Sequence, residues 1–198
     1  MKQTIEDRFQ LNIARVKNLV QIYGVITAGT GQGRKGHQQT DVLRAAVVLL
    51  HASMEDVLRS LAHWKLPASS ALVLDEFPLV GTGPNTKFSL GALSAHKGKS
   101  VNDVIKASVD KYLERSNYNN NAEVAKLLGQ IGLNASAVNH TFPLLEEVMK
   151  RRHLIVHRAD KDDVGGRGNH RVKSLGPSTV NSWIFNVEAF VNAVLAQV

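Results

Sequence analysis

Residues 45–59 read AAVVLLHASMEDVLR. Apolar residues dominate this run at helical spacing, which predicts a central and mostly buried helix. Thr40 is expected to cap the helix, which should end near Trp64 because Pro67 follows. A long buried helix of this kind needs other helices around it, so the run sets the fold class.

Three polar residues interrupt the buried helix at intervals of four: His51, Glu55 and Arg59. Residues four apart lie on one face of a helix, so these side chains form a polar stripe along an otherwise apolar element.

The same periodicity predicts further helices over about residues 5–23, 100–116, 122–130, 136–158 and 178–198. Thr4, Ser100 and Ser178 are the expected N-terminal caps. Pro143 either kinks its helix or marks the true first turn. Residues 66–99 are expected to form an irregular, loop-rich excursion, in which residues 72–74 form a short strand or a helical turn. The expected fold is an all-α bundle of about five to six helices, in one domain spanning residues 1–198.

Composition excludes several classes of protein. The chain has 198 residues and no Cys, so thiolate nucleophiles, redox pairs and Cys-based zinc sites are excluded. The longest strongly apolar run, residues 45–50, is far shorter than the roughly 20 residues of a membrane span. The N-terminal residues show no signal peptide. We expect a cytoplasmic protein that makes no contact with a membrane.

Positive charge is concentrated in one segment. The chain carries 24 Lys and Arg against 17 Asp and Glu, a net charge of +7 that indicates polyanions as plausible partners. Residues 150–173 contain eight of these cations and only three Asp, so a local balance of +5 lies within 24 residues.

Two other patterns are weak. Residues 31–36 read GQGRKG and match G-x-G-x-x-G, but no alternation of strands and helices surrounds them, so a flexible connector is favoured over nucleotide binding. No G-x-S-x-G motif is present, and the adjacent Asp75 and Glu76 do not form the separated carboxylate pair of a hydrolase.

The segment RRHLIVHR, residues 151–158, allows two interpretations without RNA chemistry. In one, residues 154–156 pack inward and the charged residues form a solvated helix end, where each cation is favoured by about 0.3–1 kcal/mol. In the other, His153 and His157, four apart on one face, bind a metal together with His51 and Glu55. Three neighbouring Arg side chains would crowd a divalent cation there.

A third interpretation is a phosphodiester-cleaving site. Cleavage of RNA through its own 2′-hydroxyl needs a base, an acid and a cation that neutralises the phosphorane. Histidine titrates near physiological pH and suits both proton transfers, and a guanidinium binds phosphate oxygens. His157 and Arg152, five residues apart near a helix end, supply these groups without a metal or other cofactor.

The motif Arg152-x4-His157, with the polar His153 directly after the Arg, resembles the R-x(4–6)-H motif of the HEPN superfamily. Residues 45–59 are similar to the helix that packs against the motif helix in that superfamily. The order of helices and residues 151–160 most resemble the branch called RiboL-PSP-HEPN, over most of the chain.

The resemblance implies a homodimer of all-helical subunits in which two motif helices meet at a cleft. It also implies a metal-independent endoribonuclease of the kind found in toxins and anti-phage defence systems. Such an enzyme would have an antitoxin or another defence-system component as its partner. By position, His157 would be the acid/base, Arg152 the phosphate-binding cation and His153 a polar assistant. Supporting residues would be Glu55, Arg59 and His51, and the expected RNA-binding cations are Lys150, Arg151, Arg158, Arg167 and Arg171.

Two alternatives come from other classes. The first is a non-catalytic helical module that binds RNA or a protein. The second is a metal-dependent hydrolase that uses His51, Glu55, His153 and His157.

Overall fold

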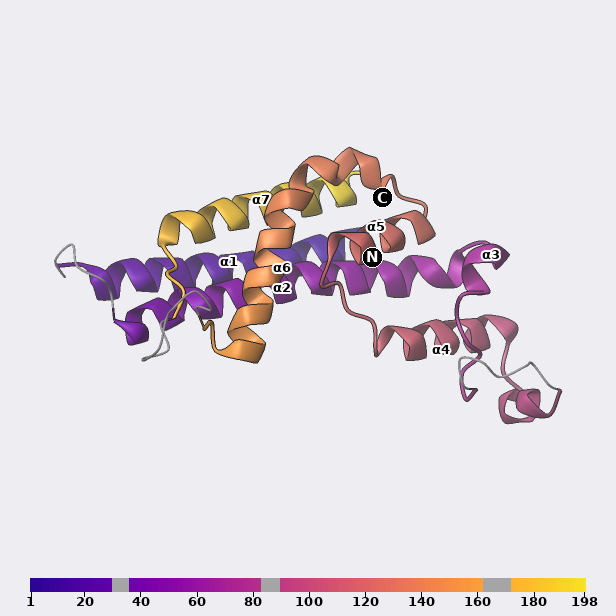
Figure 1. The fold of residues 1–198 in the computed structure, drawn as a ribbon. Helices are drawn as coiled ribbons and strands as arrows, with labels where there is room; N and C mark the ends of the chain where they lie inside the picture. The colour runs from indigo at the N-terminus through magenta and orange to yellow at the C-terminus, as the bar shows by residue number, and fades with distance from the viewer. Residues whose placement is uncertain (30–35, 83–89, 162–171) are drawn as a thin grey trace.

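Two long antiparallel helices form the axis of the molecule, in a computed structural model that describes residues 1–29, 36–82, 90–161 and 172–198. Helix α1 (Lys2–Thr27) and helix α2 (His37–Lys65) lie side by side over most of their length (Figure 1). α2 contains the expected buried run and contacts five of the other helices, so it is the central element of the fold.

Two helices close to the C-terminus cover this axis. Helix α7 (Pro177–Leu195) packs along both α1 and α2, whereas α6 (Phe142–Arg158) crosses α2 steeply (Figure 1). A 3-10 segment, η3 (Ala135–Thr141), leads into α6. The crossing brings the polar residues of α6 close to the polar stripe of α2.

The remaining elements lie near the C-terminal end of α2. They are η1 (Leu66–Ala68), α3 (Ala71–Leu74), η2 (Leu90–His96), α4 (Val101–Leu113) and α5 (Asn121–Gln130). The excursion over residues 66–99 is irregular as expected, with short elements in its described part, and residues 72–74 form a helical turn rather than a strand.

One apolar core joins these helices. It is formed by the inward faces of α1, α2 and α7, with contributions from α4, α5 and α6. Its largest fully buried side chains include Phe9 of α1 and Phe190 of α7. Burying apolar surface contributes roughly 25 cal/mol per Å², so this shared core is the main stabilising term of the fold.

Three of the predicted helix starts are corrected. α1 begins after Met1, two residues before Thr4 could cap it. α2 begins after Gly36, and the Thr40 hydroxyl donates to the Gly36 carbonyl from within the first turn. α7 begins after Gly176 because Pro177, with its preset φ and no N–H, suits the first helical position better than Ser178 does.

One predicted helix start is confirmed, and the structure decides between the two alternatives left open for Pro143. The Ser100 hydroxyl accepts a hydrogen bond of 3.1 Å from the Asp103 N–H, as a capping residue should. Pro143 lies in the first turn of α6 and does not kink it.

The fold class is confirmed as all-α. The described residues contain six helices of ten residues or more and the four-residue α3, and their only β-type pairing is an isolated bridge between Lys161 and Val172. None of the described helices combines the length and the apolar character needed to cross a membrane.

Candidate functional site

The last two turns of α6 carry the residues that the sequence singled out. His153 and His157 are exposed on one face, with ring centroids 4.7 Å apart and planes inclined by 44°. Arg152 is half-buried and lies toward α2. The structure therefore brings the two histidines together, while Arg152 is close enough to a buried residue of α2 to affect its charge.

That buried residue is His51, whose side chain is 1% exposed. Its Nδ1 lies 3.7 Å from a carboxylate oxygen of Glu55, and the backbone of Tyr118 also interacts with the imidazole. Burial lowers the pKa of His51 below its ordinary value of 6.5, with Glu55 opposing this shift and the positive charge of Arg152 adding to it. His51 is therefore mainly neutral at pH 7.

Arg59 connects the polar stripe to the loop between α4 and α5. One guanidinium nitrogen donates to the other carboxylate oxygen of Glu55 at 3.0 Å and to the Ser116 carbonyl. Its second nitrogen donates to the Leu113 carbonyl at 2.7 Å. Glu55 thus lies between a neutral imidazole and a fixed guanidinium, and the three stripe residues act as one network.

Tyr118, in the same loop, is a member of this network that the sequence did not single out. It is 4% exposed, and burial raises the pKa of its phenol to about 12, with Arg59 opposing and Glu55 adding to the shift. The phenol therefore stays protonated throughout the physiological range. The only signal in the sequence is one aromatic residue within the Asn-rich patch 117–121.

A second buried cluster anchors the end of α6. Asp160 is fully buried, and one of its carboxylate oxygens accepts from Arg44 at 2.7 Å and from Arg151 at 2.8 Å. The Asp160 N–H donates to the Leu154 carbonyl, and its own carbonyl accepts from the Lys173 N–H. This cluster joins α2, α6 and the chain that returns toward α7.

The cluster gives Arg151 a role different from the expected contact with RNA. Arg151 is 7% exposed, and besides Asp160 its guanidinium donates to the carbonyls of Lys173 and Ser174. A buried guanidinium with these partners positions α6 and has little surface open to a phosphate. The sequence did not single out Arg44. It lies seven residues, or two helical turns, before His51, and this spacing could have placed it on the polar stripe of α2.

The backbone at this anchor is unusual. Ala159 and Asp160 both adopt left-handed conformations, with φ of 48° and 59°. Each costs a non-glycine residue of order 1 kcal/mol, so the cluster around Asp160 offsets strain that would otherwise let the end of α6 fray.

The other expected RNA-binding cations are placed only in part. Lys150 is exposed and pairs with Glu146 at 2.6 Å, and Arg158 is exposed at the end of α6. Arg167 and Arg171 lie outside the described residues, as do most of the glycine-rich pattern at residues 31–36 and part of the basic segment.

A metal centre is not assembled by the residues that the structure describes. Among them, no three His, Asp or Glu side chains gather as a metal ion requires. His51 is buried within the bundle, whereas His153 and His157 are exposed on α6. The four ligands of the alternative metal-dependent interpretation therefore do not come together among the described residues of one chain.

The arrangement has clear chemical capacities. Two exposed imidazoles can exchange protons with a bound molecule, and a neighbouring guanidinium can bind an anion. The buried network of Glu55 and Arg59 joins α2 to the end of α4 and to the loop that follows it.

The family model described as RiboL-PSP-HEPN matches residues 10–197 of the chain. No curated protein and no solved structure matches it. The matched range includes every candidate residue described above.

Proposed function

Because the chain belongs to the RiboL-PSP-HEPN family, we propose that it is a metal-independent endoribonuclease. The family supports an RNase-like or nucleotide-binding function in general. The observation that carries the finer proposal is the exposed pair His153 and His157, 4.7 Å apart, on the helix that also carries Arg152.

In the proposed reaction, the 2′-hydroxyl oxygen of RNA attacks the adjacent phosphorus. A histidine removes the hydroxyl proton, and the bond to the 5′-oxygen breaks as that oxygen receives a proton. His157 is the acid/base, His153 assists it, and Arg152 neutralises the charge that develops on the phosphorane. The products are a 2′,3′-cyclic phosphate and a free 5′-hydroxyl.

The exposed face of α6 supports a site shared between two copies of the chain. Val156 is 48% exposed on the turn between His153 and His157, although it is apolar. Within one chain, Arg152 lies toward His51 while the two histidines face outward. We therefore propose a homodimer in which two α6 helices meet, so that histidines and Arg152 from both copies act on one phosphate.

The cellular setting is also a proposal. A cytoplasmic toxin or anti-phage ribonuclease, controlled by an antitoxin or by another defence component, is the setting that family membership favours.

The test is cleavage of total RNA by purified protein in the presence of EDTA. We expect wild type to produce fragments with cyclic phosphate ends, and His157→Ala to be slower by about 10²–10⁴-fold, the usual contribution of one acid/base group. His140→Ala is the matched control, because His140 is exposed on η3, before the start of α6. Cleavage that persists undiminished in His157→Ala would contradict the proposal.

RNA binding without cleavage is the second candidate. The proximity of Arg152 to the buried His51 favours it, because a guanidinium directed toward the bundle is less available to a phosphate at the exposed histidines. The same preparations distinguish the two functions, because a protein that only binds retards RNA without shortening it, and its affinity falls steeply with salt.

A further inference from the structure

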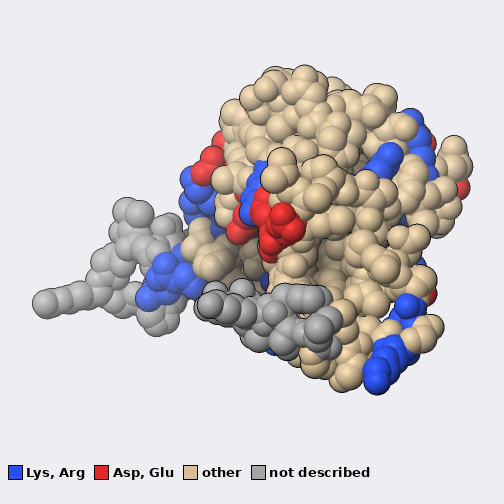
Figure 2. All heavy atoms as spheres, turned by 90° about the vertical axis from the view of Figure 1, so that its right-hand side faces the viewer, with Lys and Arg blue, Asp and Glu red and all other residues tan. Residues whose placement is uncertain are grey.

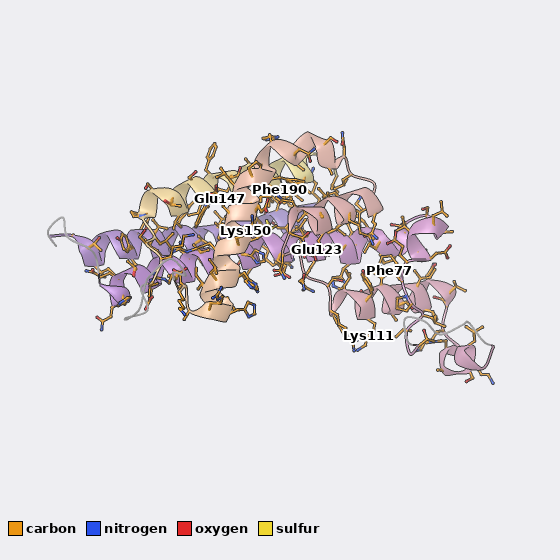
Figure 3. All side chains as sticks on the ribbon, viewed as in Figure 1. Phe77, Lys111, Glu123, Glu147, Lys150 and Phe190 are labelled. Carbon is orange, nitrogen blue, oxygen red and sulfur yellow. The ribbon has the colours of Figure 1, made fainter. Side chains whose placement is uncertain are left out.

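A cavity of about 960 Å³ lies at the end of the bundle, away from the histidines of α6. Its walls come from the end of α3 and residues 75–82, from α4, from the 114–118 stretch and from α5. Figure 3 labels Phe77, Lys111 and Glu123, three lining residues from three of these segments. Its size is within the range of pockets that hold small organic ligands.

One wall of the cavity is aromatic. Phe77 and Tyr112 meet edge to face, with ring centroids 4.7 Å apart. Tyr112 is 40% exposed although it lines the cavity, so part of its ring is open to an incoming molecule. An aromatic surface of this kind stacks on flat heterocycles, because every base presents a π-face.

The charges of the lining balance. Asp75, Glu76 and Glu123 offset Lys111, Arg115 and Lys126, and Lys126 is already paired with Glu76 at 2.6 Å. Figure 2, which views this end of the molecule, shows acidic and basic side chains side by side. A balanced lining has little attraction for a phosphate group but suits a neutral molecule with hydrogen-bond donors and acceptors.

Two polar groups of the lining remain open for such a molecule. The carboxylate of Asp75 and the guanidinium of Arg115 make no side-chain hydrogen bond or ion pair with other residues in the described part of the chain. They supply one acceptor and one set of donors, which is what the edge of a nucleobase requires.

The cavity shares a wall with the network under the candidate active site. Arg59 donates to the carbonyls of Leu113 and Ser116, and both residues line the cavity. Tyr118 lines it as well. The 114–118 stretch therefore has the Glu55–Arg59 pair on one side and the cavity on the other.

We propose that this cavity binds a nucleobase of single-stranded RNA, on a nucleotide other than the one cleaved at α6. Tyr112 stacks on the base, and Asp75 and Arg115 bind its edge. The inference rests on the proposed ribonuclease function for its choice of ligand. It adds a sequence-selecting site that is separate from the histidines and from Arg152.

The test measures binding of a short single-stranded 2′-O-methyl RNA, which lacks the attacking hydroxyl and so stays intact. Fluorescence anisotropy gives the affinity of full-length wild type, Tyr112→Ala and the control Phe185→Ala, which removes an exposed aromatic ring from α7. We expect Tyr112→Ala to bind at least about fivefold more weakly, the lower end of the effect of losing one base–aromatic stack, and Phe185→Ala to bind like wild type.

An abasic scan makes the test specific. Removing one base of the RNA should weaken its binding to wild type by about the same factor as Tyr112→Ala does. Removing the same base should not weaken binding to Tyr112→Ala any further, because the aromatic partner of that base is already missing. Arg115→Ala serves as a second variant if Tyr112→Ala fails to fold. Effects that multiply independently at every position, equal losses in Phe185→Ala, or no binding by wild type would each overturn the proposal.

Cleavage of unmodified RNA by the same wild-type preparation separates the two hypotheses. Cleavage without coupling between Tyr112 and any base would contradict the proposed base-binding cavity and support the proposed ribonuclease function. Coupling without cleavage would support the proposed base-binding cavity and contradict the proposed ribonuclease function.

Discussion

At the scale of single residues, the site depends on polar groups that are buried next to charge. His51 has an acidic neighbour, Glu55, at 3.7 Å and a cationic one, Arg152, yet burial is the largest influence on it. Protonating this imidazole would place a second positive charge beside Arg152 in a poorly solvated position. The neutral form of His51 therefore avoids repulsion with Arg152.

This gives a prediction about stability and pH. Because the pKa of His51 is lower in the folded than in the unfolded chain, the unfolded chain binds more protons below about pH 6.5, and stability falls as pH decreases through that range. We expect the urea-unfolding free energy of wild type to fall between about pH 7.5 and pH 5. His51→Gln should be less stable at neutral pH and lose less on acidification.

The control for this prediction is His140→Gln, which replaces an exposed histidine on η3. It should follow the pH profile of wild type. Parallel profiles for wild type and His51→Gln would show that His51 does not carry the pH dependence.

At the scale of elements, the end of α6 is determined by a tertiary anchor more than by its own sequence. A helix that carries Arg151, Arg152 and Arg158 near its C-terminus gains a modest benefit from its dipole. The buried Asp160, with Arg44 and Arg151 on one of its oxygens, holds the last turn against α2. Breaking such a buried arrangement leaves an uncompensated charge inside the protein.

Asp160→Asn tests the anchor. The change keeps the shape of the side chain but removes the buried negative charge that both Arg44 and Arg151 contact, so we expect a loss of about 3–5 kcal/mol in the free energy of unfolding. Asp41→Asn is the matched control, since Asp41 also pairs with Arg44, at 3.0 Å, but its side chain is 65% exposed. Chemical denaturation should find a loss of at most about 1 kcal/mol there. Equal losses would mean that Asp160 does not anchor α6.

At the scale of the whole molecule, stability comes from the core shared by α1, α2 and α7. Helix α7 presents two phenylalanines to different surroundings: Phe190 is fully buried, whereas Phe185 is 76% exposed. Substituting each of them therefore measures the effect of burial on stability for the same residue type in the same helix.

We expect Phe190→Ala to lower the free energy of unfolding by about 3–5 kcal/mol through lost transfer energy and a cavity. Phe185→Ala should change it by no more than about 0.5 kcal/mol. Urea titrations followed by circular dichroism measure both. A large loss for Phe185→Ala would indicate that Phe185 is buried in an assembly of the chain.

The helices were predictable because the spacing of apolar residues along the sequence indicates which face of a helix is buried. Their starts were less predictable: Thr4, Thr40 and Ser178 were the expected caps, but Met1, Gly36 and Gly176 occupy the cap positions of these three helices. A cap needs only a non-helical backbone next to the first turn, and several nearby residues can provide it.

The sequence by itself determined the all-α class, the central position of α2 and the polar stripe of His51, Glu55 and Arg59, because spacing along one helix decides which side chains share a face. Only the tertiary structure decided that this stripe meets Arg152 of α6, that Tyr118 joins it, and that Arg151 turns inward to Asp160. The reason is physical. Contacts between helices depend on crossing geometry and on how each buried charge finds a partner, and neither is recorded in the periodicity of a single segment.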